Sequence, residues 1–176
     1  MLTLNSLDAK GFLSRTNFDI NRVIKDTAAS FEGTCDSRHI RFDLTFSDNI
    51  QMVYADMGKI QQVLYNLIDN AIKYSGDSVR IDISVGSDDT YTWIRVKDNG
   101  FGISHQDQKK IFEKFERAAA IDRNRKGGAA GFGLGLNYVY RVAEAHGGEV
   151  RVFSIEGQSS EFTIYLPILI QTIETL

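Results

Sequence analysis

Three segments of the chain carry residue types that could hold a nucleotide. They are residues 66–71 (NLIDNA), 98–103 (DNGFGI) and 131–136 (GFGLGL). The first offers side-chain amide oxygens to a cation, the second places a carboxylate beside a flexible turn, and the third supplies bare backbone that phosphates can approach. Because strand-like runs separate the three segments, together they predict a nucleotide site.

Asn66, Asn70 and Lys73 are spaced i, i+4 and i+7, so they share one face of a helix. A solvated polar face is the ordinary interpretation of such a pattern, and it stays open. Asparagine is a poor helix former, however, so two on one face favour a specific role. A neutral amide oxygen suits Mg²⁺ when a triphosphate brings the negative charge, and Lys73 could place a point charge near phosphate oxygens.

Asp98 follows a strand-like run and precedes Gly100 and Gly102. It could simply form a turn by accepting hydrogen bonds from its own backbone. Alternatively, its carboxylate could accept a hydrogen bond from the exocyclic amine of adenine while the glycines let the chain fold closely around the base. An acceptor of this kind suits adenine and not guanine, because guanine presents a carbonyl there.

Gly131, Gly133 and Gly135 lack the spacing of the dinucleotide fingerprint and follow a loop instead of a strand. No Gly-Lys-Ser/Thr follows any glycine run, so the phosphate loop of P-loop enzymes is absent. Two interpretations remain. One is a glycine hinge leading into a helix whose N-terminal N–H groups hold phosphates, and the other is a flexible turn before a core helix.

The remaining pattern predicts the elements that position these segments. Helices are expected at 21–37, from Asp56 through the asparagines, at 104–110 and at 134–146, and strands at 40–46, 51–54, 79–85, 91–97, 149–154 and 161–166. Residues 117–131 are expected to form a loop over the site. This order predicts an α+β fold, a two-layer sandwich in which a mixed, mostly antiparallel sheet packs on helices.

Composition restricts the class of protein. With 176 residues and a net charge of −3, the chain is long enough for one domain and shows no electrostatic footprint for nucleic acid. It has no apolar run long enough for a membrane span, and its lone Cys35 fits a reducing compartment. We expect one domain over 17–167, an N-terminal linker remnant over 1–16 and a C-terminal tail over 168–176.

The motifs resemble those of a known family. Residues 63–75 are similar to the asparagine motif of bacterial sensor histidine kinase catalytic domains, residues 98–103 to their adenine motif, residues 112–115 to their phenylalanine motif and residues 131–136 to their lid hinge. These domains belong to the Bergerat-fold superfamily, which includes gyrase, the mismatch-repair ATPase and a heat-shock chaperone. The resemblance covers residues 17–166, most of the chain.

The resemblance implies a role for each residue. Asn70 would bind Mg²⁺ with help from Asn66, Lys73 and Arg117 would contact the phosphates of ATP, Tyr74 would pack near the base, and Asp98 would bind adenine. The glycine-rich segments would complete the nucleotide site through Gly100, Gly102, Ile103, Gly131, Gly133, Leu134, Gly135 and Leu136.

Superfamily members that hydrolyse ATP carry a Glu at the position of Asn66. An amide cannot accept a proton from water, so hydrolysis should be slow, whereas a neutral imidazole acceptor needs no such base.

The family's acceptor histidine lies in a helical dimerisation domain and is followed closely by an acidic residue. His39, His105 and His146 all lack that context. We therefore expect a cytoplasmic kinase domain that phosphorylates a histidine on a separate domain and serves a response regulator indirectly, without touching nucleic acid or membrane. A serine kinase of the anti-sigma-factor type, an ATPase that gates a conformational change and an ATP-binding module without transfer are the alternatives.

Overall fold

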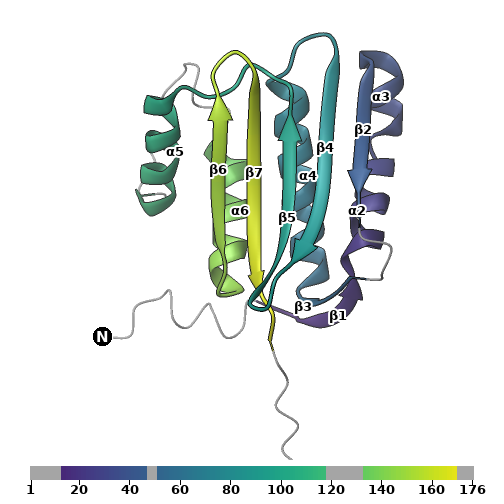
Figure 1. Cartoon of the computed structure of the whole chain (residues 1–176), viewed down its shortest axis with the longest axis vertical. Coiled ribbons are helices and arrows are strands. Elements are labelled where there is room, and N and C mark those ends of the chain that lie inside the picture. The colour runs from purple at the N-terminus through teal and green to yellow at the C-terminus, as the bar shows by residue number, and fades with distance from the viewer. Residues whose placement is uncertain (1–12, 47–50, 118–132, 170–176) are drawn as a thin grey trace, which may run out of the picture.

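A five-stranded sheet and a layer of helices make up the protein in this computed structural model, which describes residues 13–46, 51–117 and 133–169. The strands β2 (Ile40–Thr45), β4 (Val79–Ser87), β5 (Tyr91–Asp98), β7 (Ser159–Pro167) and β6 (Glu149–Ile155) lie side by side in that order. β2 pairs with β4 in parallel and the other neighbours are antiparallel. Figure 1 shows the sheet face-on. The predicted mixed, mostly antiparallel sheet is confirmed.

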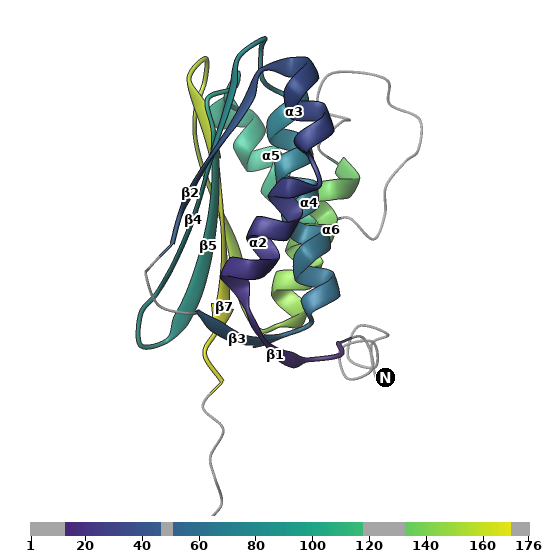
Figure 2. The same cartoon turned by 90° about the vertical axis from the view of Figure 1, so that its right-hand side faces the viewer.

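The helices cover one face of this sheet, as the side view in Figure 2 shows. They are α2 (Ile20–Ala29), α3 (Glu32–Arg38), α4 (Met57–Lys73), α5 (His105–Arg117) and α6 (Gly133–Ala145). α5 lies beside the edge formed by β6 (Figure 1). The predicted two-layer α+β sandwich is therefore confirmed.

Helix α4 is the central element of the helical layer because its apolar stripe faces the sheet. Ile60, Val63, Leu64 and Ile68 are fully buried, and they pack with sheet residues such as Ile81 in one core cluster. Burying each such side chain contributes about 1.5–3 kcal/mol to folding. α4 begins where predicted, because Asp56 Oδ1 accepts a hydrogen bond of 3.1 Å from the Lys59 N–H and so caps the helix.

The predicted helix over 21–37 is wrong in its continuity. It is broken at Ser30 and Phe31 into α2 and α3. The Ser30 hydroxyl donates to the Thr27 carbonyl at 2.6 Å, and Phe31 enters the core, where its ring stacks on Tyr65 with centroids 4.9 Å apart. Tertiary burial of Phe31 thus ends the first helix earlier than its periodicity predicts.

The first strand, β1 (Thr16–Asp19), is absent from the sequence prediction. It pairs antiparallel with β3 (Met52–Ala55) in a separate two-stranded ribbon at one end of the sandwich (Figure 1). The helix predicted over 104–110 also continues further, to Arg117. The predicted loop over 117–131 lies outside the described residues from 118 onward.

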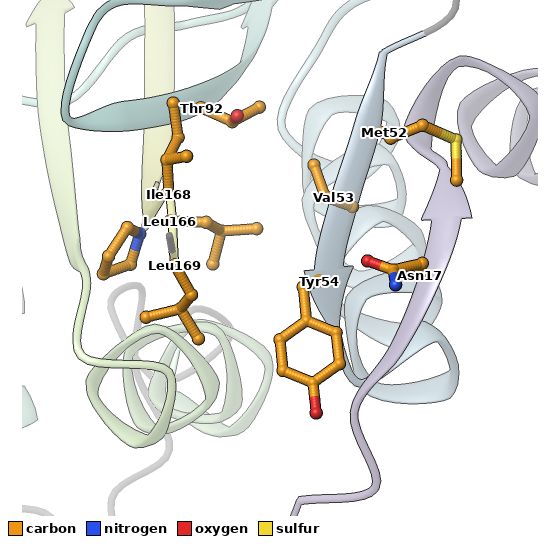
Figure 3. Close-up of a pocket in the computed structure, with 9 residues that line it drawn as sticks. Asn17, Met52, Val53, Tyr54, Thr92, Leu166, Ile168 and Leu169 are labelled. Atoms are coloured by element: carbon orange, nitrogen blue, oxygen red, sulfur yellow. The ribbon is translucent and has the colours of Figure 1, made fainter. Parts of the chain in front are cut away.

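A groove of about 120 Å³ lies where the β1–β3 ribbon approaches the ends of β5 and β7. Figure 3 shows Val53 and Tyr54 on one side of this groove and Leu166, Ile168 and Leu169 on the other. The chain continues past β7 beside the β4–β5 turn, where the Ile168 N–H donates to the Thr90 carbonyl at 2.8 Å. None of the residues predicted to bind nucleotide lines this groove.

Candidate nucleotide site

The two asparagines of α4 lie beside the first turn of α6. Asn70 is 8% exposed, and its Nδ2 has no hydrogen-bond partner among the described residues. Asn66 reaches across to α6, where its Nδ2 donates to the Gly135 carbonyl at 3.3 Å. A buried polar atom left unpaired costs about 1–3 kcal/mol. The Asn70 amide therefore lacks a partner that a bound ligand could supply.

Gly135 leaves space next to both amides. A Cβ placed on Gly135 would lie 3.8 Å from Asn66 Cβ and 3.9 Å from Asn70 Nδ2. A side chain at this position would therefore lie directly over the asparagine pair. The structure thus brings the first and third predicted segments together at the junction of α4 and α6.

Lys73, the last residue of α4, is directed to a neighbour on its own helix. Its Nζ lies 2.6 Å from Asp69 Oδ2, and the side chain is largely exposed. The hydrogen bond that its ammonium donates to Asp69 raises the pKa of Lys73. An exposed i, i+4 pair of this type is weak, so Lys73 can exchange Asp69 for a phosphate at little cost.

Asp98 ends β5 as a buried carboxylate. It accepts a hydrogen bond of 2.8 Å from the Gly100 N–H and another from the Ser160 N–H of the adjacent strand β7. Burial raises the pKa of this carboxyl to about 6, although the two backbone hydrogen bonds act in the opposite direction. No described Lys or Arg forms a salt bridge with Asp98. At neutral pH the group is thus a mostly ionised, poorly solvated acceptor.

The loop after Asp98 is fastened to the C-terminal end of α4. The Phe101 N–H donates to the Tyr74 carbonyl at 3.0 Å. A Cβ on Gly100 would lie only 2.5 Å from that carbonyl and 2.7 Å from Ser75 Oγ, so only glycine fits this close approach. The second predicted segment therefore meets the end of the helix that carries the first.

The remaining residues of the second segment face the β6–β7 hairpin. Gly102 has φ of 66°, and a Cβ there would collide with the Ile155 carbonyl. Ile103 is buried, and its N–H donates to Ser154 Oγ at 2.7 Å.

Tyr74, the residue that follows α4, is half-buried, and this burial raises the pKa of its phenol.

Part of the third segment lies outside what the structure describes. Gly131 falls outside the described residues. Arg117 ends α5, and Gly133 and Leu134 begin α6, but their side chains also lie outside the description. Leu136 is 1% exposed and belongs to the core. It therefore anchors the start of α6, next to Gly135.

Sequence reasoning missed three residues that shape the site. Ser75 is buried next to Gly100, and its hydroxyl donates to the Ala71 carbonyl. Ser160 supplies a backbone N–H to Asp98. Gln62 donates a hydrogen bond of 2.9 Å to Asn66 Oδ1. The i, i+4 spacing of Gln62 and Asn66 was a usable signal. The Ser160 contact has no sequence signal, because it depends on β5–β7 register.

The donor set fits a metal that arrives with its own anionic ligand. Among the described residues, no three His, Cys, Asp or Glu side chains gather in a way that could hold a metal ion. The buried Asn70 Nδ2 lacks a hydrogen-bond partner and could donate to a phosphate oxygen. The oxygen of the same amide is a neutral ligand of the kind that suits Mg²⁺ already bound to phosphates. The described helices also include none that is long and apolar enough to cross a membrane.

The layered fold, the amide pair and the buried acid are the features of a nucleotide-binding ATPase domain. Residues 55–170 match the family described as histidine kinase-, DNA gyrase B-, and HSP90-like ATPase, and the chain belongs to this family. The resemblance to sensor histidine kinase catalytic domains that the motifs indicate is thereby confirmed.

Similar proteins within the family are sensor kinases. The chain is 36% identical over 170 residues to the sensor histidine kinase WalK of Bacillus subtilis, covering 95% of this chain and 27% of WalK. It superposes on the catalytic domain of the histidine kinase ThkA with a TM-score of 0.73 at 26% identity, covering 88% of this chain and 97% of that domain.

The chain also resembles ThkA in a solved complex with the response regulator protein TrrA, with a TM-score of 0.71 at 25% identity over 89% of this chain and 42% of that one. It thus spans about a quarter of WalK and almost all of an isolated catalytic domain.

Proposed function

We propose that this chain binds Mg-ATP and transfers the γ-phosphoryl group to a histidine on a separate helical dimerisation and phosphoacceptor domain, in two-component signalling. The observation that supports this most directly is the connection between the two halves of the site. One helix presents the unsatisfied Asn70 amide, and the carbonyl of Tyr74 at its end holds the loop that carries Asp98. Phosphate and base recognition are therefore adjacent.

The Asp98 carboxylate binds the base. Ionised at neutral pH and screened from water, it accepts a hydrogen bond from the adenine amine. Tyr74 packs beside the ring, and Gly100, Gly102 and Ile103 shape the adjoining backbone.

The amide face of α4 and the glycine-rich start of α6 bind the triphosphate. Asn70 provides an oxygen ligand for Mg²⁺, and Asn66 lies beside it. Lys73 and Arg117 contribute positive charge to the phosphates. Residues 131–136 bring backbone N–H groups near the phosphate oxygens, since the first N–H groups of a helix have no partner within it. Magnesium, when bound, neutralises charge on the β- and γ-phosphate oxygens.

The transfer itself requires positioning and not a general base. A neutral imidazole nitrogen of the partner forms the new N–P bond, while the bond from the γ-phosphorus to the bridging oxygen breaks and ADP leaves with the electron pair. Asn66 stands where a hydrolytic base would be needed, so water competes poorly. Of the histidines, His146 is 4% exposed, with both ring nitrogens hydrogen-bonded. His39 and His105 are exposed but lack the sequence context of the family's acceptor histidine, so the proposal assigns the acceptor to the partner domain.

The test is incubation with radiolabelled Mg-ATP and a helical acceptor domain, followed by acid and alkali treatment of the product. A phosphohistidine is lost in acid and survives alkali, whereas a phosphoserine behaves oppositely. Label on the acceptor with the serine pattern would indicate the anti-sigma-factor type of kinase, and binding without label would leave an ATP-binding module. A cytoplasmic location and an indirect partnership with a response regulator belong to the same proposal.

A further inference from the structure

The side-chain amide of Asn66 is hydrogen-bonded at both ends. Its Nδ2 donates to the Gly135 carbonyl at 3.3 Å, and its Oδ1 accepts from Gln62 Nε2 at 2.9 Å. A backbone carbonyl can only accept, so the Nδ2 must face Gly135 and the Oδ1 must face Gln62. The orientation of this amide is therefore fixed by its two neighbours.

This pair of hydrogen bonds joins two helices at the nucleotide site. Gln62 and Asn66 are one turn apart on α4, and Gly135 lies in the first turn of α6. Asn70, one further turn along α4, also lies beside Gly135. A rotation of the Asn66 amide would release the Gly135 carbonyl and allow the start of α6 to move relative to Asn70.

We propose that Gln62 is a positioning residue for nucleotide binding. Its N–H group holds the Asn66 amide in the orientation that ties α4 to the start of α6. In this arrangement Asn66 links the helices, and Asn70 is the asparagine that would bind the metal, because the Asn66 amide is held in the orientation of the link by both of its ends. This inference rests on the proposed function, and it assigns to Gln62 a role that its exposure on a helix surface does not suggest.

The first experiment replaces the donor without changing the helix. Gln62→Met keeps the length of the side chain and removes its N–H group, and Gln61→Met is the matched control, since residue 61 is also exposed but five positions from Asn66 and turned away from it. Isothermal titration calorimetry should show Mg-ATP binding about 1.5- to twofold weaker in Gln62→Met, the loss expected for one exposed i, i+4 side-chain pair. Equal affinities in the two variants would overturn the proposal.

A ligand-free measurement separates this proposal from the proposed function. Amide hydrogen exchange in residues 136–139 should be faster in Gln62→Met than in Gln61→Met or the wild type, because the start of α6 loses its connection to α4. Unchanged exchange rates would contradict the link even if ATP binds. If the wild type binds no ATP while the exchange rates differ as expected, the proposed function fails and the helix link stands.

Two further substitutions test the chemistry. Gln62→Lys restores a donor at the end of a long side chain and should recover slow exchange, whereas Gln62→Glu offers acceptors only and should not. For the metal, Asn66→Ala should weaken ATP binding by a similar factor in Mg²⁺ and in EDTA, while Asn70→Ala should abolish the gain that Mg²⁺ provides. If neither variant bound ATP more tightly in Mg²⁺ than in EDTA, Asn66 would also have to be a metal ligand.

Discussion

Replacing Asp98 by Asn should stabilise the fold and weaken ATP binding at the same time. Burial raises the pKa of the Asp98 carboxyl from 3.8 to about 6, so its ionised form is disfavoured in the folded protein. The difference corresponds to roughly 3 kcal/mol between the protonated and ionised states. Asn carries no charge and keeps one oxygen that can accept from the Gly100 N–H, but its N–H₂ replaces the second acceptor, so a weakened Ser160 contact would offset part of the gain.

The pH dependence has a definite sign. Because the folded pKa lies above the unfolded one, the protonated carboxyl contributes stability that is fully present below 3.8 and is lost as the pH rises through about 6. Asp98→Asn does not titrate. The stability of the variant relative to the wild type should therefore increase as the pH rises from about 4 to about 7. The increase in the free energy of unfolding should be at most roughly 3 kcal/mol.

Nucleotide binding should change in the opposite direction. In the variant an amide N–H₂ can face the adenine amine, and the charged acceptor is gone. Hydrogen bonds to charged groups contribute about 1.5–3 kcal/mol, so ATP affinity should fall by about one to two orders of magnitude. The preference for ATP over GTP should shrink with it. Wild-type affinity for ATP should also decline below about pH 6, as Asp98 takes up a proton.

Urea unfolding of both proteins at several pH values between about 4.5 and 7.5 measures the change in stability. Calorimetry with ATP and GTP measures the change in nucleotide affinity. Asp89→Asn, at an exposed position in the β4–β5 turn, is the control. A stability difference between wild type and Asp98→Asn that does not change with pH would refute the reasoning about burial. Equal ATP and GTP affinities in the wild type would refute the role of Asp98 in base recognition.

Three other substitutions test separate parts of the site. Asn70→Ala should abolish phosphoryl transfer to a supplied acceptor domain while circular dichroism shows an intact fold, and wild-type transfer would remove Asn70 from the site. Gly102→Ala should lower the free energy of unfolding by at least about 1–3 kcal/mol, since φ is 66° and the new Cβ meets the Ile155 carbonyl; denaturant titration measures this. Asp56→Ala should cost about 1–2 kcal/mol in thermal unfolding, because it uncaps α4 and frees the Ser14 N–H, and an unchanged melting temperature would contradict the capping role.

The long helix and the central strands could be predicted from the sequence because their patterns are set by burial. The stripe that includes Ile60, Leu64 and Ile68 has helical spacing, and all three side chains are fully buried. Ile81 and Ile83 alternate with polar residues and lie on the face that the helices cover. Each pattern is local, so a single sequence is enough to reveal it.

The end of helix α2 and the contacts between residues far apart in the sequence could not be predicted in this way. The end of α2 at Ser30 depends on a distant partner, Tyr65, which receives the ring of Phe31. The strand β1 has only four residues, too few for their periodicity to distinguish a strand from a loop, whereas its partner β3 lies where the sequence predicts a strand. The bond from Phe101 to Tyr74 joins backbone atoms only, and backbone atoms carry no residue-type signature.

The bond between Phe101 and Tyr74 also limits which ligands this domain could accept. Asn70 and Tyr74 are four positions apart along one helix, a rise of about 6 Å that cannot stretch without breaking the helix. A compound with the correct purine but a longer or shorter connection to its phosphates could satisfy only one end of the site. Selection at this site should therefore depend on the length of the whole nucleotide as well as on its base.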